Sequence, residues 1–326
     1  MPTDYSAPPS GAEAPFAARH LQVEEDGAGQ RLDNFLFKHL KGVPKSRIYR
    51  MLRGGELRVN GGRAGPDTRL ELGDTLRIPP LRLPTRTAED SPAKIGKSLL
   101  GRIVYRDEAL LVLNKPAGQA VHGGSGISLG VIEQLRRELP GQRFVELAHR
   151  LDRETSGLLL VALKRSALTG LHALLRDGGV QKNYLALAGG PWRDAVRHVR
   201  LPLHKFTTAV GERRVAVRED GQFAHTVFRL RRQYPGFSLL EAELKTGRTH
   251  QIRVHLASLG HPIALDDKYG DFELNRRLKK QGLKRMFLHA ARLRLTHPLS
   301  GETLTLEAPL PADLQAFLDR LDATPA

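Results

Sequence analysis

The sequence places a carboxylate, Asp152, between Arg150 and Arg153, directly before an apolar run at residues 158–163. Neighbouring positive charges favour the ionised form of a carboxylate, and a carboxylate must be ionised to act as a nucleophile. The same spacing is also typical of a structural aspartate that caps a turn and pairs with Arg153. The residue types alone therefore leave catalysis and turn capping both open.

Other kinds of catalytic site find little support. The chain has no cysteine, which excludes disulfides, thiol catalysis and zinc–thiolate sites. His250 and His255 have a spacing that does not put both on one face of a helix, so we expect no metal. Gly96-Lys97-Ser98 lacks the earlier glycine of a phosphate loop, because Ser91 stands there. We therefore expect neither a nucleotide nor another cofactor. Three histidines are expected to form hydrogen bonds near an active cleft: His149, His250 and His289.

The charge balance indicates a polyanionic partner. The chain has 51 Lys and Arg against 35 Asp and Glu, a formal net charge of +16. Nucleic acid is the commonest polyanion, and arginine recognises its phosphates with two parallel hydrogen bonds. An anionic membrane is the rival partner, but no segment approaches the ~18 apolar residues of a spanning helix. The N-terminus also lacks a secretory signal. We therefore expect a cytoplasmic protein that binds nucleic acid and not membrane.

The elements that position Asp152 belong to a large module at residues 100–322. Apolar runs predict strands, and residues spaced three and four apart predict helices. The strands outnumber the helices and do not alternate with them, which favours an α+β fold with a mixed, mostly antiparallel sheet. Strands are expected near 103–105, 109–114, 156–163, 183–188, 225–231, 237–244, 291–296 and 302–307, and helices near 129–139, 166–177, 249–259 and 312–321.

Residues 20–82 form a second, smaller module, between a disordered tail at 1–19 and a linker at 83–99. Two short helices are expected, followed by a strand, a hairpin turn at Asn60-Gly61 and a further strand pair within 70–78. The second helix has no acidic residue and carries four cations that we expect to bind RNA phosphates: Lys45, Arg47, Arg50 and Arg53. A basic helix is also commonly just a solvated face.

Two resemblances sharpen these expectations. The segments RLDNFLFKHL, SRIYRMLRGGELRVNG and GDTLRIP resemble an S4-type RNA-binding module. The large module resembles the RluA-type family of pseudouridine synthases through five motifs in the family's order: LLVLNKPAGQAVHGG, HRLDRETSGLLLVA, VQKNYLALAGG, KTGRTHQIRVHLASLGHPIALDDKYGD and FLHAARL. They span residues 103–309. This resemblance implies conversion of uridine to pseudouridine in 23S ribosomal RNA by a monomer.

The resemblance also implies a role for each of four residues. Asp152 matches the catalytic aspartate, and Arg150 matches the arginine that fills the stack left by the flipped uridine. Tyr184 matches the tyrosine that stacks on the target base, although a tyrosine in a strand is otherwise most often a core residue. Arg248 matches the arginine that pairs with the aspartate, although a phosphate contact could coexist with that role.

The reaction itself requires little from the protein. It breaks the N1–C1′ bond and joins C5 to C1′, with no oxidation or hydrolysis. Whether Asp152 attacks C1′ or assists glycal formation stays open, and Tyr184 and Asp152 are both candidates to take the C5 proton. Two rivals remain: a non-catalytic factor that binds rRNA during ribosome assembly, and an N-glycosidase that releases uracil.

Overall fold

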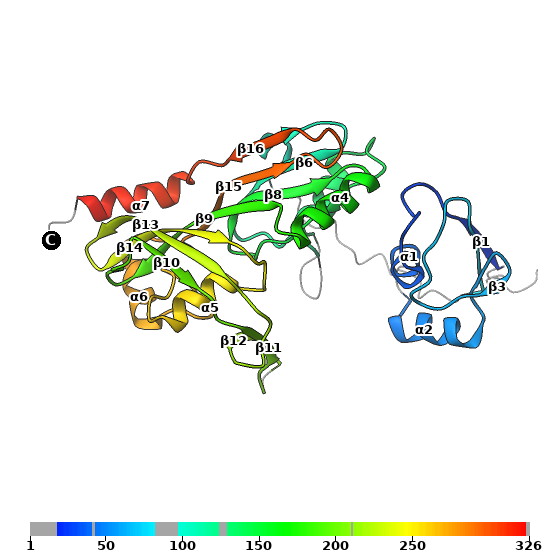
Figure 1. The fold of residues 1–326 in the computed structure, drawn as a ribbon, viewed down its shortest axis with the longest axis horizontal. Coiled ribbons are helices and arrows are strands. Elements are labelled where there is room, and N and C mark those ends of the chain that lie inside the picture. Colours follow the sequence, from blue (N-terminus) through cyan, green and yellow to red (C-terminus); the bar gives the residue numbers. More distant parts are fainter. Residues whose placement is uncertain (1–17, 41–42, 82–96, 124–128, 210, 324–326) are drawn as a thin grey trace, which may run out of the picture. The chain divides into compact units, whose positions relative to one another are not determined.

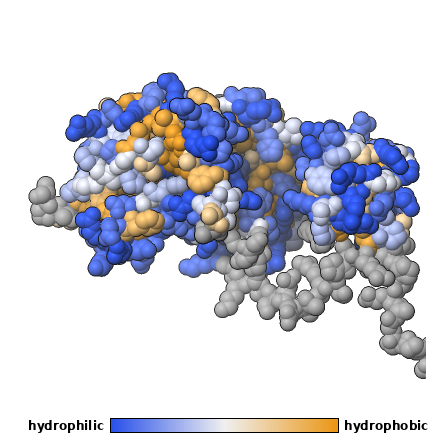
Figure 2. Space-filling view, turned by 90° about the horizontal axis from the view of Figure 1, so that it is seen from below, coloured by the Kyte–Doolittle hydropathy of each residue, from blue (hydrophilic) through white to orange (hydrophobic). Residues whose placement is uncertain are grey.

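The structure is a computed structural model that describes residues 18–40, 43–81, 97–123, 129–209 and 211–323. The chain divides into two compact units, residues 1–91 and 92–326 (Figure 1). Most of the expected tail and most of the expected linker lie outside the described residues. Hydrophilic residues cover much of the face shown in Figure 2, and hydrophobic residues gather there in patches.

The smaller unit is a four-stranded antiparallel sheet with two helices. Its elements are β1 (Arg19–Gln22), α1 (Leu32–His39), α2 (Lys45–Gly54), β2 (Arg58–Val59), β3 (Gly62–Arg63) and β4 (Thr75–Ile78). The strand order is β1-β4-β2-β3. One apolar core joins the helices to the sheet and includes Phe35, Ile48, Met51 and Leu76.

The turns of the smaller unit follow the sequence. Asn60 and Gly61 both have positive φ, 49° and 76°, so the predicted hairpin turn is confirmed. The predicted strand pair within 70–78 is wrong, because residues 71–74 form a turn with Gly73 at φ 88°. Only β4 is a strand there, and its partner is β1.

The larger unit is a mixed, mostly antiparallel sheet, which confirms the expected α+β class. The strand order along the main path is β10-β13-β14-β9-β15-β8-β6-β5, with β16 paired to β15 and β7 to β8. The β8–β15 pair is parallel. The strands are β5 (Ile103–Arg106), β6 (Leu110–Lys115), β7 (Glu146–Leu147), β8 (Ser156–Ala162), β9 (Val180–Gly189), β10 (Val196–Val199), β13 (Thr226–Tyr234), β14 (Phe237–Leu244), β15 (Leu288–Thr296) and β16 (Thr303–Glu307).

Helices cover both faces of this sheet. They are α3 (Val131–Glu138), α4 (Arg165–Arg176), α5 (Gln251–Ser258), α6 (Phe272–Lys280) and α7 (Ala312–Asp322), with a 3-10 turn η1 (Leu100–Arg102). Alternate residues of β6 and β8 enter different cores, as the pleat of a strand requires. One core contains α3 and α5 side chains, and another contains those of α4. A further core contains α6 and α7 side chains against β9 and β14.

Several elements escaped the sequence analysis. A separate two-stranded ribbon, β11 (Leu203–Thr207) and β12 (Arg213–Val217), carries no run of apolar residues that would mark it. Edge strand β10 escaped as well, because it is short and largely exposed. Helix α6 did have a start signal, because the Asp271 side chain accepts hydrogen bonds from the backbone N–H groups of Glu273 and Leu274.

Candidate active site

Asp152 lies in the turn between β7 and β8, and this turn is held in place. The backbone N–H of Thr155 donates to the carbonyl of Asp152 over 3.2 Å. The next carbonyl, that of Arg153, accepts from the backbone N–H of Gly118 at 2.8 Å and from Lys115 Nζ at 3.1 Å. Lys115 is fully buried, and burial lowers its pKa to about 7. These bonds fix the backbone on the C-terminal side of the carboxylate.

Gly157 brings this turn close to the middle of the sheet. Its φ of 109° lies in the region that favours glycine, and a Cβ there would collide with the backbone of Ala290 in β15. Ala290 is also the register partner of Tyr184 in β9. A single residue of β15 therefore has the Asp152 turn on one side and Tyr184 on the other.

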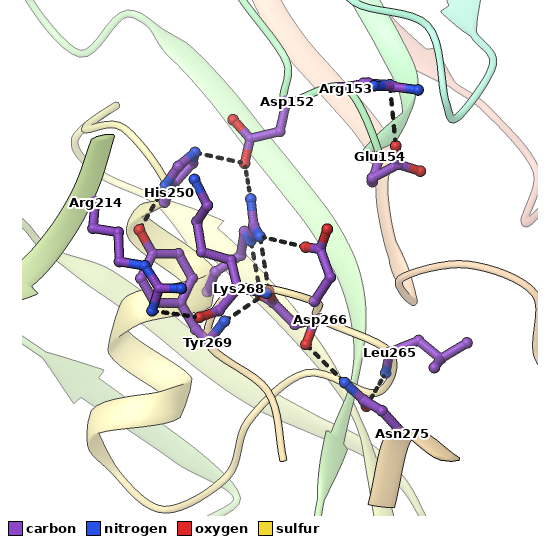
Figure 3. A network of polar contacts seen from close by, with 12 residues as sticks. Asp152, Arg153, Glu154, Arg214, His250, Leu265, Asp266, Lys268, Tyr269 and Asn275 are labelled. Carbon is purple, nitrogen blue, oxygen red and sulfur yellow. Dashed lines mark hydrogen bonds and ion pairs between the residues drawn. The ribbon is translucent and has the colours of Figure 1, made fainter. Parts of the chain in front are cut away.

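Arg253 is the ion-pair partner that holds Asp152. Its Nη1 donates to Asp152 Oδ2 over 3.0 Å, and its Nε and Nη2 both donate to Asp266 over 2.7 Å (Figure 3). Burial by itself lowers the pKa of Arg253, but hydrogen bonds and charge from Asp266 and then Asp152 outweigh it and raise the pKa. Among the described residues, the partners of the Asp152 carboxylate, Arg253 and His250, both contact Oδ2 and not Oδ1.

Asp266 anchors this arrangement from a fully buried position. Its Oδ1 also accepts from the backbone N–H groups of Lys268 at 2.9 Å and Tyr269 at 3.0 Å. Burial would raise the pKa of Asp266, but the hydrogen bonds and the charge of Arg253 hold it below its usual value. The guanidinium that faces Asp152 is thus held from the other side by a carboxylate that is ionised at neutral pH.

The expectation that Arg248 pairs with Asp152 is therefore wrong. Arg248 lines the same cavity, but its Nε donates to the backbone carbonyl of Phe223 over 3.1 Å. Arg253 instead lies buried in α5, where its guanidinium reaches both Asp152 and Asp266. One signal could have found Arg253: it lies between the apolar residues Ile252 and Val254 of its helix, and an arginine that is buried needs a carboxylate partner.

His250 sits between the helix and the carboxylate in a strained conformation. It precedes α5 with φ 54°, in the left-handed region that residues other than glycine rarely adopt. Its Nε2 lies 3.8 Å from Asp152 Oδ2, and its Nδ1 lies 2.7 Å from the hydroxyl of Tyr269. Leu265, beside Asp266, has positive φ as well. Such strain occurs preferentially where function requires a particular geometry.

A cavity of about 550 Å³ opens in front of Asp152. Tyr184 lines it and is 7% exposed, so it is nearly buried but presents part of its surface to the cavity. Burial, and next the charge of Asp152, raise the pKa of Tyr184, so its hydroxyl stays protonated at neutral pH. Arg150, which is exposed, also lines the cavity.

The cavity wall is strongly cationic. Asp152 is the one acidic residue among its described lining residues, and the cations are Arg150, Arg176, Lys182, Lys245, Arg248 and Arg253. Burial lowers the pKa of Lys182, which the sequence analysis did not single out. The lining combines several positive charges with apolar side chains such as Leu151, Leu244 and Ile252, which suits an anionic ligand that has an apolar part.

Two of the three histidines expected near the cleft line this cavity. His149 Nε2 accepts a hydrogen bond from the backbone N–H of Leu160 over 3.0 Å, and burial lowers its pKa to about 4. His250 is the second. His289 instead contacts Ser156 Oγ over 2.9 Å and is not among the lining residues.

The basic helix α2 of the smaller unit keeps only part of its charge free. The helix has no acidic residue of its own, but Arg47 pairs with Glu56, just beyond the helix, over 3.1 Å. Lys45 lies over the ring of Phe37 at 4.9 Å. Arg50 and Arg53 are exposed. The two arginines are thus the residues of α2 best placed to contact phosphate.

Two searches of the described residues complete the description. No group of three or more His, Cys, Asp or Glu residues there could hold a metal ion. No helix in the described part of the chain is long and apolar enough to cross a membrane.

Comparison with known proteins identifies the class to which this site belongs. Residues 109–258 match the RNA pseudouridylate synthase family, and residues 30–76 match the S4 domain. The chain belongs to the RNA pseudouridylate synthase family, as the sequence motifs predicted, and it carries an S4 domain in front of the synthase unit.

Particular relatives match along almost the whole chain. The chain is 51% identical to ribosomal large subunit pseudouridine synthase C of Pasteurella multocida, over 94% of each chain. It is 52% identical to the protein of that name from Escherichia coli K12, over 92% of this chain and 96% of the relative. Among solved structures, human RNA pseudouridylate synthase domain containing 4 is 29% identical with a TM-score of 0.57, over 69% of this chain and 95% of that one.

Proposed function

We propose that this protein isomerises uridines to pseudouridine in the 23S RNA of the large ribosomal subunit, with Asp152 as the catalytic carboxylate. One observation carries the proposal: Arg253 holds Asp152 by Oδ2 and not by Oδ1, in a cationic cavity that Tyr184 also lines. The names of the relatives supply the substrate class, the large-subunit rRNA.

The cavity suits a uridine that has left its stack. Base flipping costs a few kcal/mol, and stacking on an aromatic face returns about 1–3 kcal/mol. We assign the stacking to Tyr184 and propose that Arg150, exposed beside the cavity, occupies the space that the uridine leaves. Arg248 would bind a phosphate at the entrance.

The bond changes are balanced without any further reactant. The N1–C1′ bond breaks, the freed base turns, C5 bonds to C1′, C5 loses its proton and N1 gains one. Asp152 can stabilise C1′ either as a nucleophile or by helping to form a glycal, and both routes need the carboxylate ionised. Because its raised pKa keeps the Tyr184 hydroxyl protonated, no tyrosinate is present to take the C5 proton, which favours Asp152 as the acceptor.

The smaller unit would supply affinity rather than chemistry. Each phosphate that Arg50 or Arg53 neutralises releases counterions and adds binding free energy. Lys45 and Arg47 would contribute less, because a ring and a carboxylate already engage them.

We further propose that the protein works in the cytoplasm as a monomer. We expect it to need no cofactor, since the isomerisation involves no redox or hydrolytic step.

Asp152→Asn tests the proposal against both rivals. The substrate is large-subunit rRNA from a strain that lacks the gene, and the measurements are pseudouridine mapping and free uracil. The parent should form pseudouridine and release no uracil. Asp152→Asn should form none and should bind the rRNA as the parent does, because asparagine keeps the size but cannot attack C1′.

A neighbouring carboxylate provides the matched control. Glu154 pairs with Arg153 at 3.4 Å outside the cavity lining, so Glu154→Gln should keep the activity of the parent. Free uracil from the parent would indicate an N-glycosidase. Pseudouridine formation by Asp152→Asn at more than a trace rate would remove Asp152 from its proposed role.

A further inference from the structure

A row of aromatic rings lies beside the cavity, on residues that the proposed reaction does not use. Phe223 is 58% exposed. Its ring centroid lies 6.5 Å from that of His225, and the ring of His225 lies 5.3 Å from that of exposed His198. A single exposed apolar residue is ordinary on a protein surface. What distinguishes Phe223 is the row of rings and its connection to the cavity.

Hydrogen bonds tie these residues directly to the wall of the cavity. Arg248 Nε donates to the carbonyl of Phe223 over 3.1 Å. The backbone N–H of His225 donates to Thr246 Oγ1 over 2.9 Å, and Gln251 Nε2 donates to the carbonyl of His225 over 3.0 Å. Arg248, Thr246 and Gln251 all line the cavity. The backbone that carries Phe223 and His225 therefore has a fixed position next to the site where the uridine would enter.

The charges around the rings suit an RNA strand. Burial, followed by the charges of Arg200, His198 and Lys245, lowers the pKa of His225, so its ring is uncharged at neutral pH. The uncharged imidazole of His225 lies beside the phenyl ring of Phe223, tilted by 54° to it, and adds to the apolar ring surface, while the nearby cations can bind phosphate. Aromatic faces flanked by cations are the usual means of binding unpaired nucleotides.

We propose that Phe223, supported by His225 and His198, is a stacking platform for an unpaired base next to the target uridine. The inference rests on the proposed function, because a uridine in the cavity sets its neighbours against this surface. The ligand is a nucleobase of the same RNA strand, with its phosphates toward Arg248 and Lys245. The platform selects target uridines whose neighbour is unpaired, since a paired base has no free face to offer.

The experiment uses the full-length protein and a large-subunit rRNA fragment that the parent modifies. The fluorescent base 2-aminopurine replaces, one at a time, the nucleotides on either side of the modified uridine. The variants are Phe223→Leu, which keeps an apolar side chain but has no ring, and Phe223→Trp, which keeps a ring. Phe272→Leu is the matched control, because Phe272 is 63% exposed on α6 and does not line the cavity.

At one position the parent should quench the fluorescence, as stacking does, and Phe223→Leu should abolish the quenching. Phe223→Leu should also weaken binding about tenfold, within the range of base–aromatic stacking. Phe223→Trp and Phe272→Leu should bind as the parent does. An abasic nucleotide at the quenched position should weaken the parent but not weaken Phe223→Leu any further.

Two results would overturn the platform. One is affinity of Phe223→Leu within twofold of the parent, and the other is equal losses for Phe223→Leu and Phe272→Leu. Failure of the proposed function looks different, because the parent would then modify no large-subunit rRNA fragment at all.

Discussion

The buried pair of Arg253 and Asp266 makes a sharp prediction about stability. Arg253→Met keeps the length of the side chain but removes the charge that faces Asp266, which is fully buried. Asp266→Asn removes the opposite charge. We expect the second substitution to destabilise the parent but to stabilise the Arg253→Met variant.

The magnitudes follow from the contacts. Removing one partner of a buried ion pair costs about 3–5 kcal/mol. Asp266 keeps two backbone N–H donors, so we expect about 3 kcal/mol for Arg253→Met. Asp266→Asn alone weakens charged hydrogen bonds and should cost about 2 kcal/mol, because Arg253 still has Asp152. The double variant buries no unpaired charge, so its total cost should be about 2 kcal/mol rather than the sum.

Urea unfolding of the four proteins at neutral pH measures this coupling. Trp192 is the only tryptophan and is buried in the larger unit, so its fluorescence reports the unfolding of that unit. The control cycle uses Arg276 and Glu273, a pair whose side chains are 71% and 75% exposed. Exposed pairs couple weakly, so Arg276→Met and Glu273→Gln should be additive within the error of the measurement.

Additive costs in the Arg253–Asp266 cycle would refute the reasoning, because the buried carboxylate would then not depend on the guanidinium. A coupling of the same size in the control cycle would refute it too. Both Arg253→Met proteins should lose pseudouridine formation, since Asp152 loses its partner even where stability is restored.

Three further predictions concern single groups. Tyr184→Phe should keep the affinity for rRNA and slow turnover less than tenfold, because the hydroxyl stays protonated. Tyr184→Leu lacks the ring and should weaken binding about tenfold. Single-turnover kinetics separate the effect on turnover from the effect on binding. Because the pKa of His149 is lowered to about 4 from an ordinary 6.5, unfolding free energy should fall as pH drops from 6.5 to 4, by up to about 3 kcal/mol from this group. His149→Gln, whose amide oxygen can accept from Leu160, should flatten that dependence, and an unchanged slope would contradict the assignment. Arg50→Glu with Arg53→Glu should make the slope of log affinity against log salt shallower, and an unchanged slope would mean that α2 does not touch RNA.

Local patterns in the sequence were sufficient for much of the fold. The apolar runs that became β6 and β8 could only be buried strands, because they are short and apolar on both faces. Asn60-Gly61 predicted its hairpin because both residues tolerate positive φ. The ribbon of β11 and β12 escaped for the converse reason: its strands lack an apolar alternation.

The sequence by itself determined that Asp152 lies between cations and shortly before a buried strand, and its motifs indicated the family. Only the tertiary structure decided which arginine serves the carboxylate, because Arg253 and Asp152 lie 101 residues apart. Arg253 reaches Asp152 from the buried helix α5, which His250 precedes in a left-handed conformation. A fully buried carboxylate, Asp266, fixes the guanidinium from behind. Contacts of this range follow from the packing of the helix against the sheet, which no local pattern records.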